Sequence, residues 1–157
     1  MSSGVPTGIV AAHSSPIDAW VQLGVASGRV ISVSFPSSEP PAAGEDHVVL
    51  DRLLAYLRGD AQEDFGDVEI ALTTSTEERK VLEAVREIGY GSELTPDGVA
   101  AVAAVESQGS DERKAAVAAA LRNNPMPILI PDHRVTEVTG ATPPNIRAHC
   151  RSLERLT

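Results

Sequence analysis

Asp132 and His133 place a carboxylate directly beside an imidazole at the end of a proline-rich segment, residues 122–135. Carboxylate and imidazole groups commonly act as nucleophile, general base or proton carrier near neutral pH. Each proline of the segment fixes a backbone torsion and removes an amide donor, so we expect an extended, stiff strand that presents Asp132 on a rigid turn. Taken alone, the pair also fits a turn aspartate beside a core histidine, because short motifs are weak evidence.

The composition predicts a protein of one domain or two small domains with an acidic surface. The 157 residues include 22 acidic and 13 basic side chains, and the formal net charge is −9. Such an acidic, lysine-poor, alanine-rich composition is typical of adaptation to high intracellular salt. The bases are concentrated late in the chain, where residues 113–155 contain seven basic and three acidic residues. We therefore expect a polyanion such as DNA to bind the second half.

Several classes of protein do not fit this sequence. It contains no long apolar run and no targeting segment, so we expect a cytoplasmic protein that does not enter a membrane. Its single cysteine, Cys150, excludes an internal disulfide, and the scattered histidines have no zinc-ligand spacing. The acidic residues Glu63, Asp64 and Asp67 are typical of a solvated surface. We expect no metal and no cofactor.

Residues 1–74 are predicted to form an α/β scaffold domain. Apolar residues alternate in 20–25 and again in 29–35, and the short glycine-containing connection between them is typical of a β-hairpin. A helix is expected at 47–58, where apolar residues have helical spacing. Another strand is expected at 65–72.

Residues 75–157 are predicted to form a mainly helical domain, in which Thr76 caps the first helix. Two short alanine-rich helices, 95–105 and 111–121, have the pattern of a helix-turn-helix, although an ordinary αα-hairpin has the same pattern. After the proline-rich strand, a last amphipathic helix is expected at 145–156. Its basic side chains fall on one side at i, i+4 and i+8: Arg147, Arg151 and Arg155.

Four stretches together identify a family: 54–59 followed by Phe65, then 81–91, then Val99-Ala100-Ala101 with Ala116-Val117, and finally Arg-Asn-Asn-Pro-Met-Pro-Ile-Leu-Ile-Pro-Asp-His-Arg-Val at 122–135. In this order they resemble the O6-alkylguanine-DNA alkyltransferases, also called methylated-DNA-protein-cysteine methyltransferases. The resemblance implies a ribonuclease-H-like scaffold domain, then a helical DNA-binding domain with a helix-turn-helix. It also implies DNA repair at O6-alkylguanine.

In that family a cysteine between the proline and the histidine accepts the alkyl group, and a glutamate holds the activating histidine. This chain has Asp132 at that acceptor position. The resemblance implies that His133 is the histidine, that Asn124 braces the turn, and that the glutamate lies near Cys150. A carboxylate is a hard nucleophile that is already ionised at neutral pH, so a histidine cannot activate it by removing a proton. We therefore expect lesion binding without transfer, as in the alkyltransferase-like proteins.

The resemblance also implies contacts to double-stranded DNA that carries O6-alkylguanine. The family's intercalating arginine aligns with Ala115, and its phosphate-rotating tyrosine aligns with Pro96, so neighbouring residues would have to substitute. We expect a monomer that also meets other repair proteins. The expected DNA contacts are Thr95, Arg113, Lys114, Arg122 and Arg134.

Three alternatives remain open. The protein could be an active methyltransferase with an atypical acceptor, either Asp132 or Cys150, because the last helix would bring Cys150 towards His133. It could instead be a helix-turn-helix DNA-binding or regulatory protein without lesion chemistry, whose DNA affinity would fall steeply with added salt. The net acidity also fits an interaction protein that binds no nucleic acid.

Overall fold

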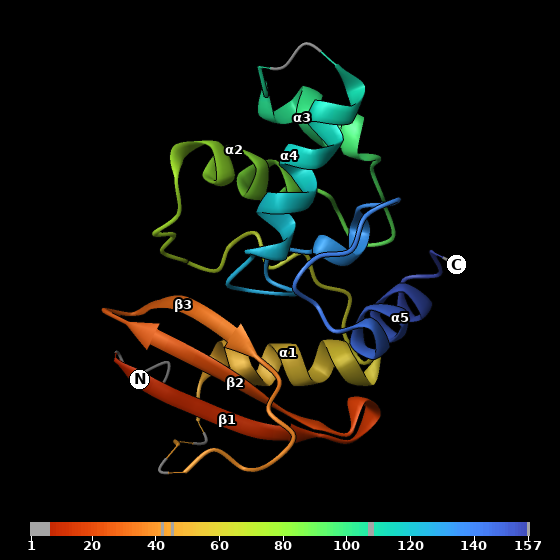
Figure 1. Cartoon of the computed structure of the whole chain (residues 1–157). Coiled ribbons are helices and arrows are strands. Elements are labelled where there is room, and N and C mark those ends of the chain that lie inside the picture. Colours follow the sequence, from red (N-terminus) through yellow and green to blue (C-terminus); the bar gives the residue numbers. More distant parts are fainter. Residues whose placement is uncertain (1–6, 42, 45, 107–108, 157) are drawn as a thin grey trace. The chain divides into compact units, whose positions relative to one another are not determined.

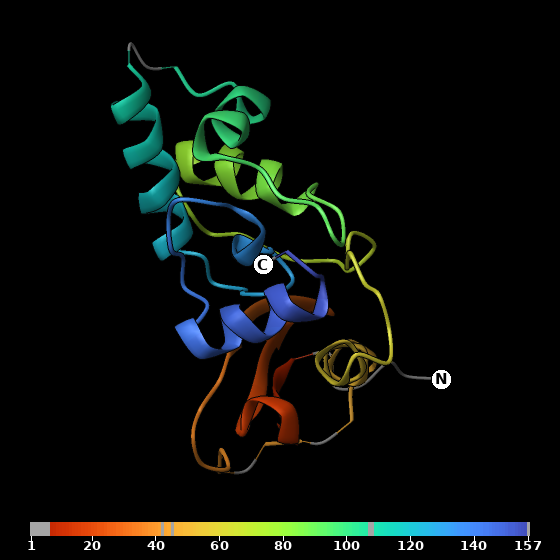
Figure 2. The same ribbon diagram turned by 90° about the vertical axis from the view of Figure 1, so that its right-hand side faces the viewer.

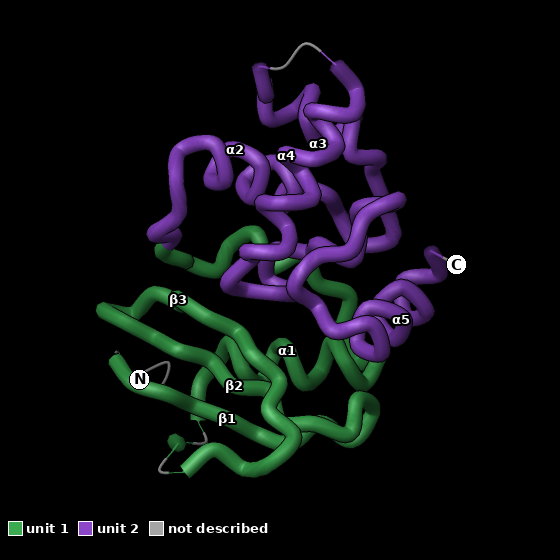
Figure 3. The backbone as a smooth tube through the Cα atoms, in the orientation of Figure 1, with its two compact units in different colours: residues 1–71 green, residues 72–157 purple. Residues whose placement is uncertain are grey.

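The computed structural model describes residues 7–41, 43–44, 46–106 and 109–156. The chain forms two compact units, Met1–Ala71 and Leu72–Thr157 (Figure 3). The predicted domain boundary, between residues 74 and 75, lies close to this division. Within the described part of the chain, every helix is too short or too polar to span a bilayer.

The first unit contains a three-stranded antiparallel sheet in the order β1-β2-β3 (Figure 1). The predicted hairpin is confirmed as β2 and β3. Ser27 and Gly28 join these strands with φ values of 50° and 79°, which is the turn that matches the twist of a hairpin. Strand β1 was not predicted, because its apolar run is short and its pairing comes from β2. The elements are β1 (Gly8–Ser14), η1 (Ser15–Ile17), β2 (Ala19–Ala26), β3 (Arg29–Ser34) and α1 (Val48–Arg58).

Helix α1 contacts β1 and β2 and closes the core of the first unit. Figure 2 views this olive-coloured helix nearly along its axis, beside the sheet. Leu50, Leu53 and Leu57 from the helix are fully buried. Nδ1 of His47 accepts a hydrogen bond from the Val49 amide at 3.1 Å and caps the start of the helix. The predicted helix at 47–58 is therefore confirmed apart from its capping residue.

The strand predicted at residues 65–72 is wrong. Phe65 has a φ of 54°, and its carbonyl accepts from the Val68 amide at 3.1 Å, so the chain turns there. Only an isolated parallel bridge between Val30 and Ile70 remains. The alternating apolar residues of this stretch place Phe65 and Val68 in the core, but the stretch makes no continuous hydrogen-bond ladder with a strand.

The second unit is mainly helical, as predicted. Helices α3 and α4 pack against each other, and both pack against α2 (Figure 1). Leu82, Val99, Val117 and Leu121 are fully buried among these helices. The connection predicted at residues 106–110 includes residues 107 and 108, which lie outside the described residues. The elements are α2 (Thr76–Arg86), α3 (Pro96–Ala103), α4 (Ser110–Arg122), η2 (Asp132–Arg134) and α5 (Pro144–Leu153).

Two helix ends differ from the sequence-based expectation. Ser75, rather than Thr76, caps α2, because its extended backbone lets Oγ accept from the Glu78 amide at 3.3 Å. Helix α5 ends at Leu153, and Arg155 follows in a left-handed conformation with a φ of 60°. The predicted arginine stripe on this helix therefore lacks its last member.

The proline-rich segment folds into turns and does not form the predicted strand. The Ile130 amide donates to the Met126 carbonyl at 2.9 Å, and Ile128 between them has a φ of 76°. Asn124 supports the turn on both sides, since its amide group donates to the Ile130 carbonyl and accepts from the Met126 amide, each at 2.9 Å. Prolines cannot donate to a ladder, so the chain satisfies its polar groups within the turn.

Candidate functional site

Asp132 begins η2 and is fully buried. Its Oδ2 accepts hydrogen bonds from Nδ2 of Asn124 at 3.0 Å and from the Thr142 amide at 3.3 Å. Oδ1 is buried and has no hydrogen-bond partner among the described residues. The carboxylate therefore joins the proline-rich turn to the connection that leads into α5.

Gly140 closes directly over Asp132. A Cβ atom added at Gly140 would lie 2.6 Å from Cγ of Asp132 and 2.7 Å from Oδ2, which is closer than real atoms approach. Only a glycine fits this position without a shift of the loop. The acceptor position is thus sealed by backbone in this structure.

His133 and Glu154 form a buried pair. Nε2 of His133 lies 2.8 Å from Oε2 of Glu154, and both side chains are inaccessible to solvent. Burial lowers the pKa of His133, while the hydrogen bond to Glu154 opposes this shift. A neutral imidazole beside a carboxylate must carry its proton on the facing nitrogen, because an ionised carboxylate only accepts. His133 is therefore oriented as a donor to Glu154.

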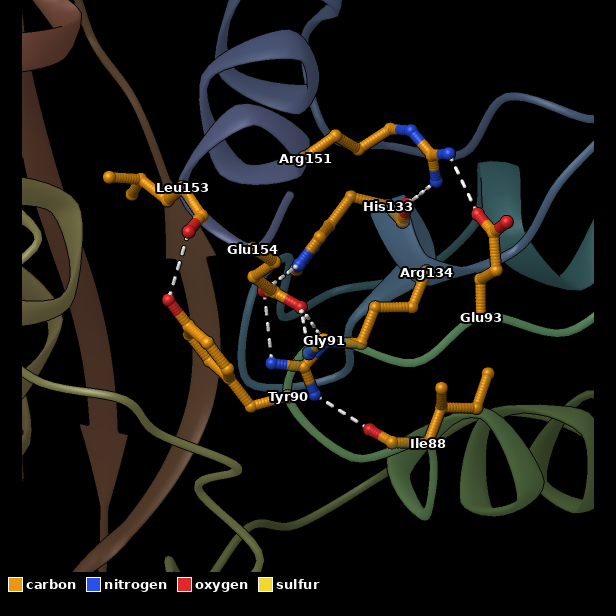
Figure 4. A network of polar contacts seen from close by, with 9 residues as sticks. All are labelled: Ile88, Tyr90, Gly91, Glu93, His133, Arg134, Arg151, Leu153 and Glu154. Atoms are coloured by element: carbon orange, nitrogen blue, oxygen red, sulfur yellow. Dashed lines mark hydrogen bonds and ion pairs between the residues drawn. The ribbon is translucent and has the colours of Figure 1, made fainter. Parts of the chain in front are cut away.

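Arg134 completes the charge balance of this pair. Its Nε lies 2.8 Å from Oε1 of Glu154, and one terminal nitrogen donates to the Ile88 carbonyl at 2.6 Å. The Gly91 amide donates to the same carboxylate at 3.0 Å. Figure 4 shows these groups converging on Glu154, with the Tyr90 ring alongside. Burial of a carboxylate is tolerated here because several donors surround it.

The prediction that Arg134 contacts DNA is wrong. The residue is only 1% exposed, and its guanidinium binds Glu154 within the core of the unit. A phosphate outside the protein cannot reach it. The glutamate that was expected near Cys150 corresponds to Glu154, one helical turn later, which contacts His133. Only this contact between distant segments distinguishes Glu154 from other acidic residues.

Two arginines of α5 hold the backbone of η2. Arg147 donates to the carbonyls of Asp132 and Val135 at 3.2 and 3.0 Å. Arg151 donates to the His133 carbonyl at 2.8 Å and pairs with Glu93 at 2.7 Å. Burial, together with the positive charge of Arg151, lowers the pKa of Arg147. The two side chains fix the backbone that carries the candidate site.

The remaining predicted DNA contacts lie on α3 and α4. Thr95 caps α3, and its Oγ1 accepts from the Gly98 amide at 3.1 Å. Arg113 pairs with Asp97 at 3.2 Å, and hydrogen bonds from Ser110 and then Arg113 lower the pKa of Asp97. Each of these groups is at least partly accessible to solvent.

Arg122, at the end of α4, is exposed and lines a hollow of about 450 Å³. Lys114 pairs with Glu137, another lining residue, at 3.4 Å. The hollow is lined by Ala118, Arg122, Glu137, Val138, Thr139 and Arg147.

Cys150 lies on α5 and is fully buried. A thiol in that position cannot meet a substrate without movement of the helix. Among the described residues, no group of three or more histidine, cysteine, aspartate or glutamate side chains is arranged to hold a metal ion.

The sequence matches known DNA repair proteins. A family profile for the DNA-binding domain of 6-O-methylguanine DNA methyltransferase matches residues 76–155. The methylated-DNA--protein-cysteine methyltransferase of Methanopyrus kandleri is 33% identical over 114 residues, which cover 71% of this chain and 81% of that protein. Its counterpart in Metallosphaera sedula is 35% identical over 85 residues, 54% of this chain and 49% of that protein. The chain belongs to the O6-methylguanine DNA methyltransferase family, as its motifs predicted.

Solved structures show the same fold. The O6-methylguanine methyltransferase of Mycobacterium tuberculosis superposes with a TM-score of 0.71 at 22% identity, covering 95% of this chain and 94% of that chain. The M. tuberculosis protein OGT in complex with DNA gives 0.69 at 22% identity, with coverage of 94% and 91%. The enzyme of Pyrococcus kodakaraensis gives 0.67 at 17% identity, with coverage of 93% and 97%. The predicted order of a small α/β unit before a helical unit agrees with this fold.

Proposed function

We propose that this protein recognises O6-alkylguanine in duplex DNA and binds the lesion without accepting its alkyl group. One observation carries the proposal: Asp132 stands at the acceptor position, fully buried, with Oδ2 held by Asn124 and Thr142. Alkyl transfer requires an activated nucleophile with an available electron pair. A carboxylate is a hard nucleophile, and this one is held by two hydrogen bonds on Oδ2, so it is a poor candidate even though Oδ1 has no partner among the described residues.

The surroundings of Asp132 support a retained binding role. The Leu94 amide donates to the Arg134 carbonyl at 3.0 Å, and the Thr136 amide donates to the Leu94 carbonyl at 2.9 Å. These bonds tie the turn that contains Asp132 to the segment just before α3. These bonds would hold the turn that contains Asp132 in a fixed position relative to DNA bound on α3 and α4.

We assign the DNA-binding surface to α3 and α4 as a helix-turn-helix. Arg113, Lys114 and Arg122 would supply phosphate contacts from α4. The hollow of about 450 Å³ beside Arg122 falls in the size range of small-molecule pockets and can hold an unstacked base. Arg113 and Lys114 flank Ala115, so either side chain can take the place of an intercalating arginine.

The proposal is tested with duplex DNA that carries one O6-methylguanine, in high-salt buffer. We expect the intact mass of the protein to stay unchanged, and we expect tighter binding to this duplex than to an unmodified one. A gain of one methyl group, mapped to Asp132 or Cys150, would show that the protein is an active methyltransferase. Equal affinity for both duplexes would favour a general DNA-binding protein.

The structure offers less support for the alternative acceptor Cys150. Its thiol is fully buried, and Nε2 of His133 is directed at Glu154. We therefore favour recognition without transfer.

A protein that binds a lesion without removing the alkyl group leaves the repair to other proteins. We therefore further propose that this protein is a cytoplasmic monomer that presents the bound lesion to other repair proteins.

A further inference from the structure

A second hollow, of about 420 Å³, lies between the connection to α5 and α5 itself. It shares Thr139 and Arg147 with the hollow beside Arg122, so the two are neighbours. None of its lining residues is acidic. They are Thr139, Gly140, Thr142, Pro144, Arg147, Ala148 and Arg151.

The polar side chains of this second hollow are two arginines, which only donate, and two threonines, whose hydroxyl groups can donate. Thr142 is 3% exposed, and its hydroxyl has no hydrogen-bond partner among the described residues. Arg147 donates to two backbone carbonyls, and no carboxylate lies within ion-pair distance of it in the described part of the chain. Arg147 keeps N–H groups beyond those that hold η2. Nη2 of Arg151 also donates to Glu93 and to the Leu156 carbonyl, which leaves the Nε and one Nη1 N–H group of Arg151 for a ligand.

The start of α5 adds to this arrangement. Pro143 precedes the helix and its side chain makes no capping hydrogen bond. The amides of Asn145 and Ile146, in the first turn, therefore have no side-chain cap. Uncapped amides and the positive end of the helix dipole favour an anion. Two nearby carboxylates, Glu93 on Arg151 and Asp132 behind Gly140, offset part of the positive charge. Binding must therefore depend on directed hydrogen bonds more than on net charge.

We infer that this second hollow binds a phosphate group. Phosphate oxygens accept from guanidinium and helix amide groups together, which matches the donors of Arg147, Arg151 and the first turn of α5. The Thr142 hydroxyl, which is enclosed and without a partner among the described residues, would add a donor on turning towards the hollow. The volume exceeds that of one phosphate, so an attached organic group also fits against Pro144 and Ala148. The phosphate comes either from a free nucleotide or from the DNA backbone, and the second source rests on the proposed function.

The test is a titration of the full chain, followed by amide chemical shifts. Guanosine 5′-monophosphate and inorganic phosphate should shift the amides of Thr142, Asn145 and Ile146, whereas guanosine should leave them unchanged. Equal shifts with guanosine, or no shift with either phosphate, would overturn the inference. Thr142→Val should weaken binding about tenfold, because it removes a donor to a charged group.

An exposed position in the wall supplies a matched pair of variants. Ala148→Glu should weaken phosphate binding about tenfold or more by like-charge repulsion, whereas Ala148→Gln, of the same size, should retain it. Ser152→Glu, on the same helix but outside the hollow, controls for the change in net charge. If Ala148→Glu and Ala148→Gln bind phosphate equally, the inference fails.

The same variants identify the source of the phosphate. If Ala148→Glu weakens duplex DNA binding more than Ser152→Glu does, the hollow takes a phosphate of the DNA backbone. If both variants bind DNA alike, the ligand is a free phosphorylated molecule. Lesion preference is measured separately on the unaltered protein, so its loss would refute the proposed function and leave the phosphate site standing.

Discussion

Nε2 of His133 lies 2.8 Å from Oε2 of Glu154, and the pair is sealed from solvent next to the acceptor position at Asp132. A histidine held by a carboxylate is the arrangement that activates a neighbouring thiol. Under the proposed function, the His133–Glu154 pair keeps this arrangement beside a carboxylate, Asp132, in place of a thiol.

We expect Asp132→Cys to create alkyl transfer. The thiol would stand beside the His133–Glu154 pair, and the protein should gain one methyl group at position 132 after incubation with O6-methylguanine duplex. Intact mass and peptide mapping measure this gain. Asp132→Ser is the matched control and should gain nothing. A folded Asp132→Cys protein that binds the lesion yet stays unmethylated would show that this pair does not activate a thiol here.

We expect Gly140→Ala to lower the free energy of unfolding by about 1–3 kcal/mol, because the new methyl group would overlap Asp132. Urea unfolding measures the change. Gly66→Ala is the control, since nothing lies within 4 Å of a Cβ at Gly66. The double variant Gly140→Ala, Asp132→Ala should recover part of the loss. If the two substitutions lower the free energy of unfolding additively in the double variant, the methyl group at position 140 does not overlap the Asp132 side chain.

Glu154→Gln should lower the free energy of unfolding by about 3–5 kcal/mol, because it leaves the buried guanidinium of Arg134 without a counter-charge. The comparison is Glu137→Gln, which breaks an exposed pair with Lys114 and should change the same quantity by less than about 1 kcal/mol. Both values come from urea unfolding. Similar losses in the two variants would contradict a charge-balancing role for Glu154.

Stability should fall as the solution is acidified. Burial lowers the folded-state pKa of both His133 and His47 below 6.5, the value of a free imidazole. Below this value the unfolded chain binds more protons than the folded chain. The contribution of the two histidines to the free energy of unfolding is therefore complete above about pH 6.5 and is lost as the pH falls through the folded pKa values. Urea unfolding at a series of pH values measures this. His47→Asn keeps a capping side chain and should reduce the fall, whereas an equally steep fall in that variant would exclude His47 as a source.

Arg122→Ala should weaken duplex DNA binding and reduce the slope of log affinity against log salt by about one, as expected for loss of one phosphate contact. Fluorescence anisotropy at several salt concentrations measures the slope. Arg29→Ala, an exposed arginine in the other unit, should leave both quantities unchanged. An unchanged slope in Arg122→Ala would remove this residue from the DNA-binding surface.

The sequence by itself determined the family and most regular elements. Alternating apolar residues define the β2–β3 hairpin, and helical spacing defines α1, because these patterns act over a few neighbouring residues. The order of motifs from residue 54 to residue 135 identified the family, because each motif is a short stretch of neighbouring residues. It also located Asp132 at the acceptor position and Asn124 at the turn.

Only the tertiary structure decided how the site is built. His133 and Glu154 are 21 residues apart in the chain. No local pattern predicts that pairing, the burial of Arg134 against it, or the closure of Gly140 over Asp132. The proline-rich segment folds into turns because Asn124 satisfies its backbone groups. The sequence therefore shows which chemical groups are available. Contacts between distant segments decide which of these groups are buried, paired or covered by backbone.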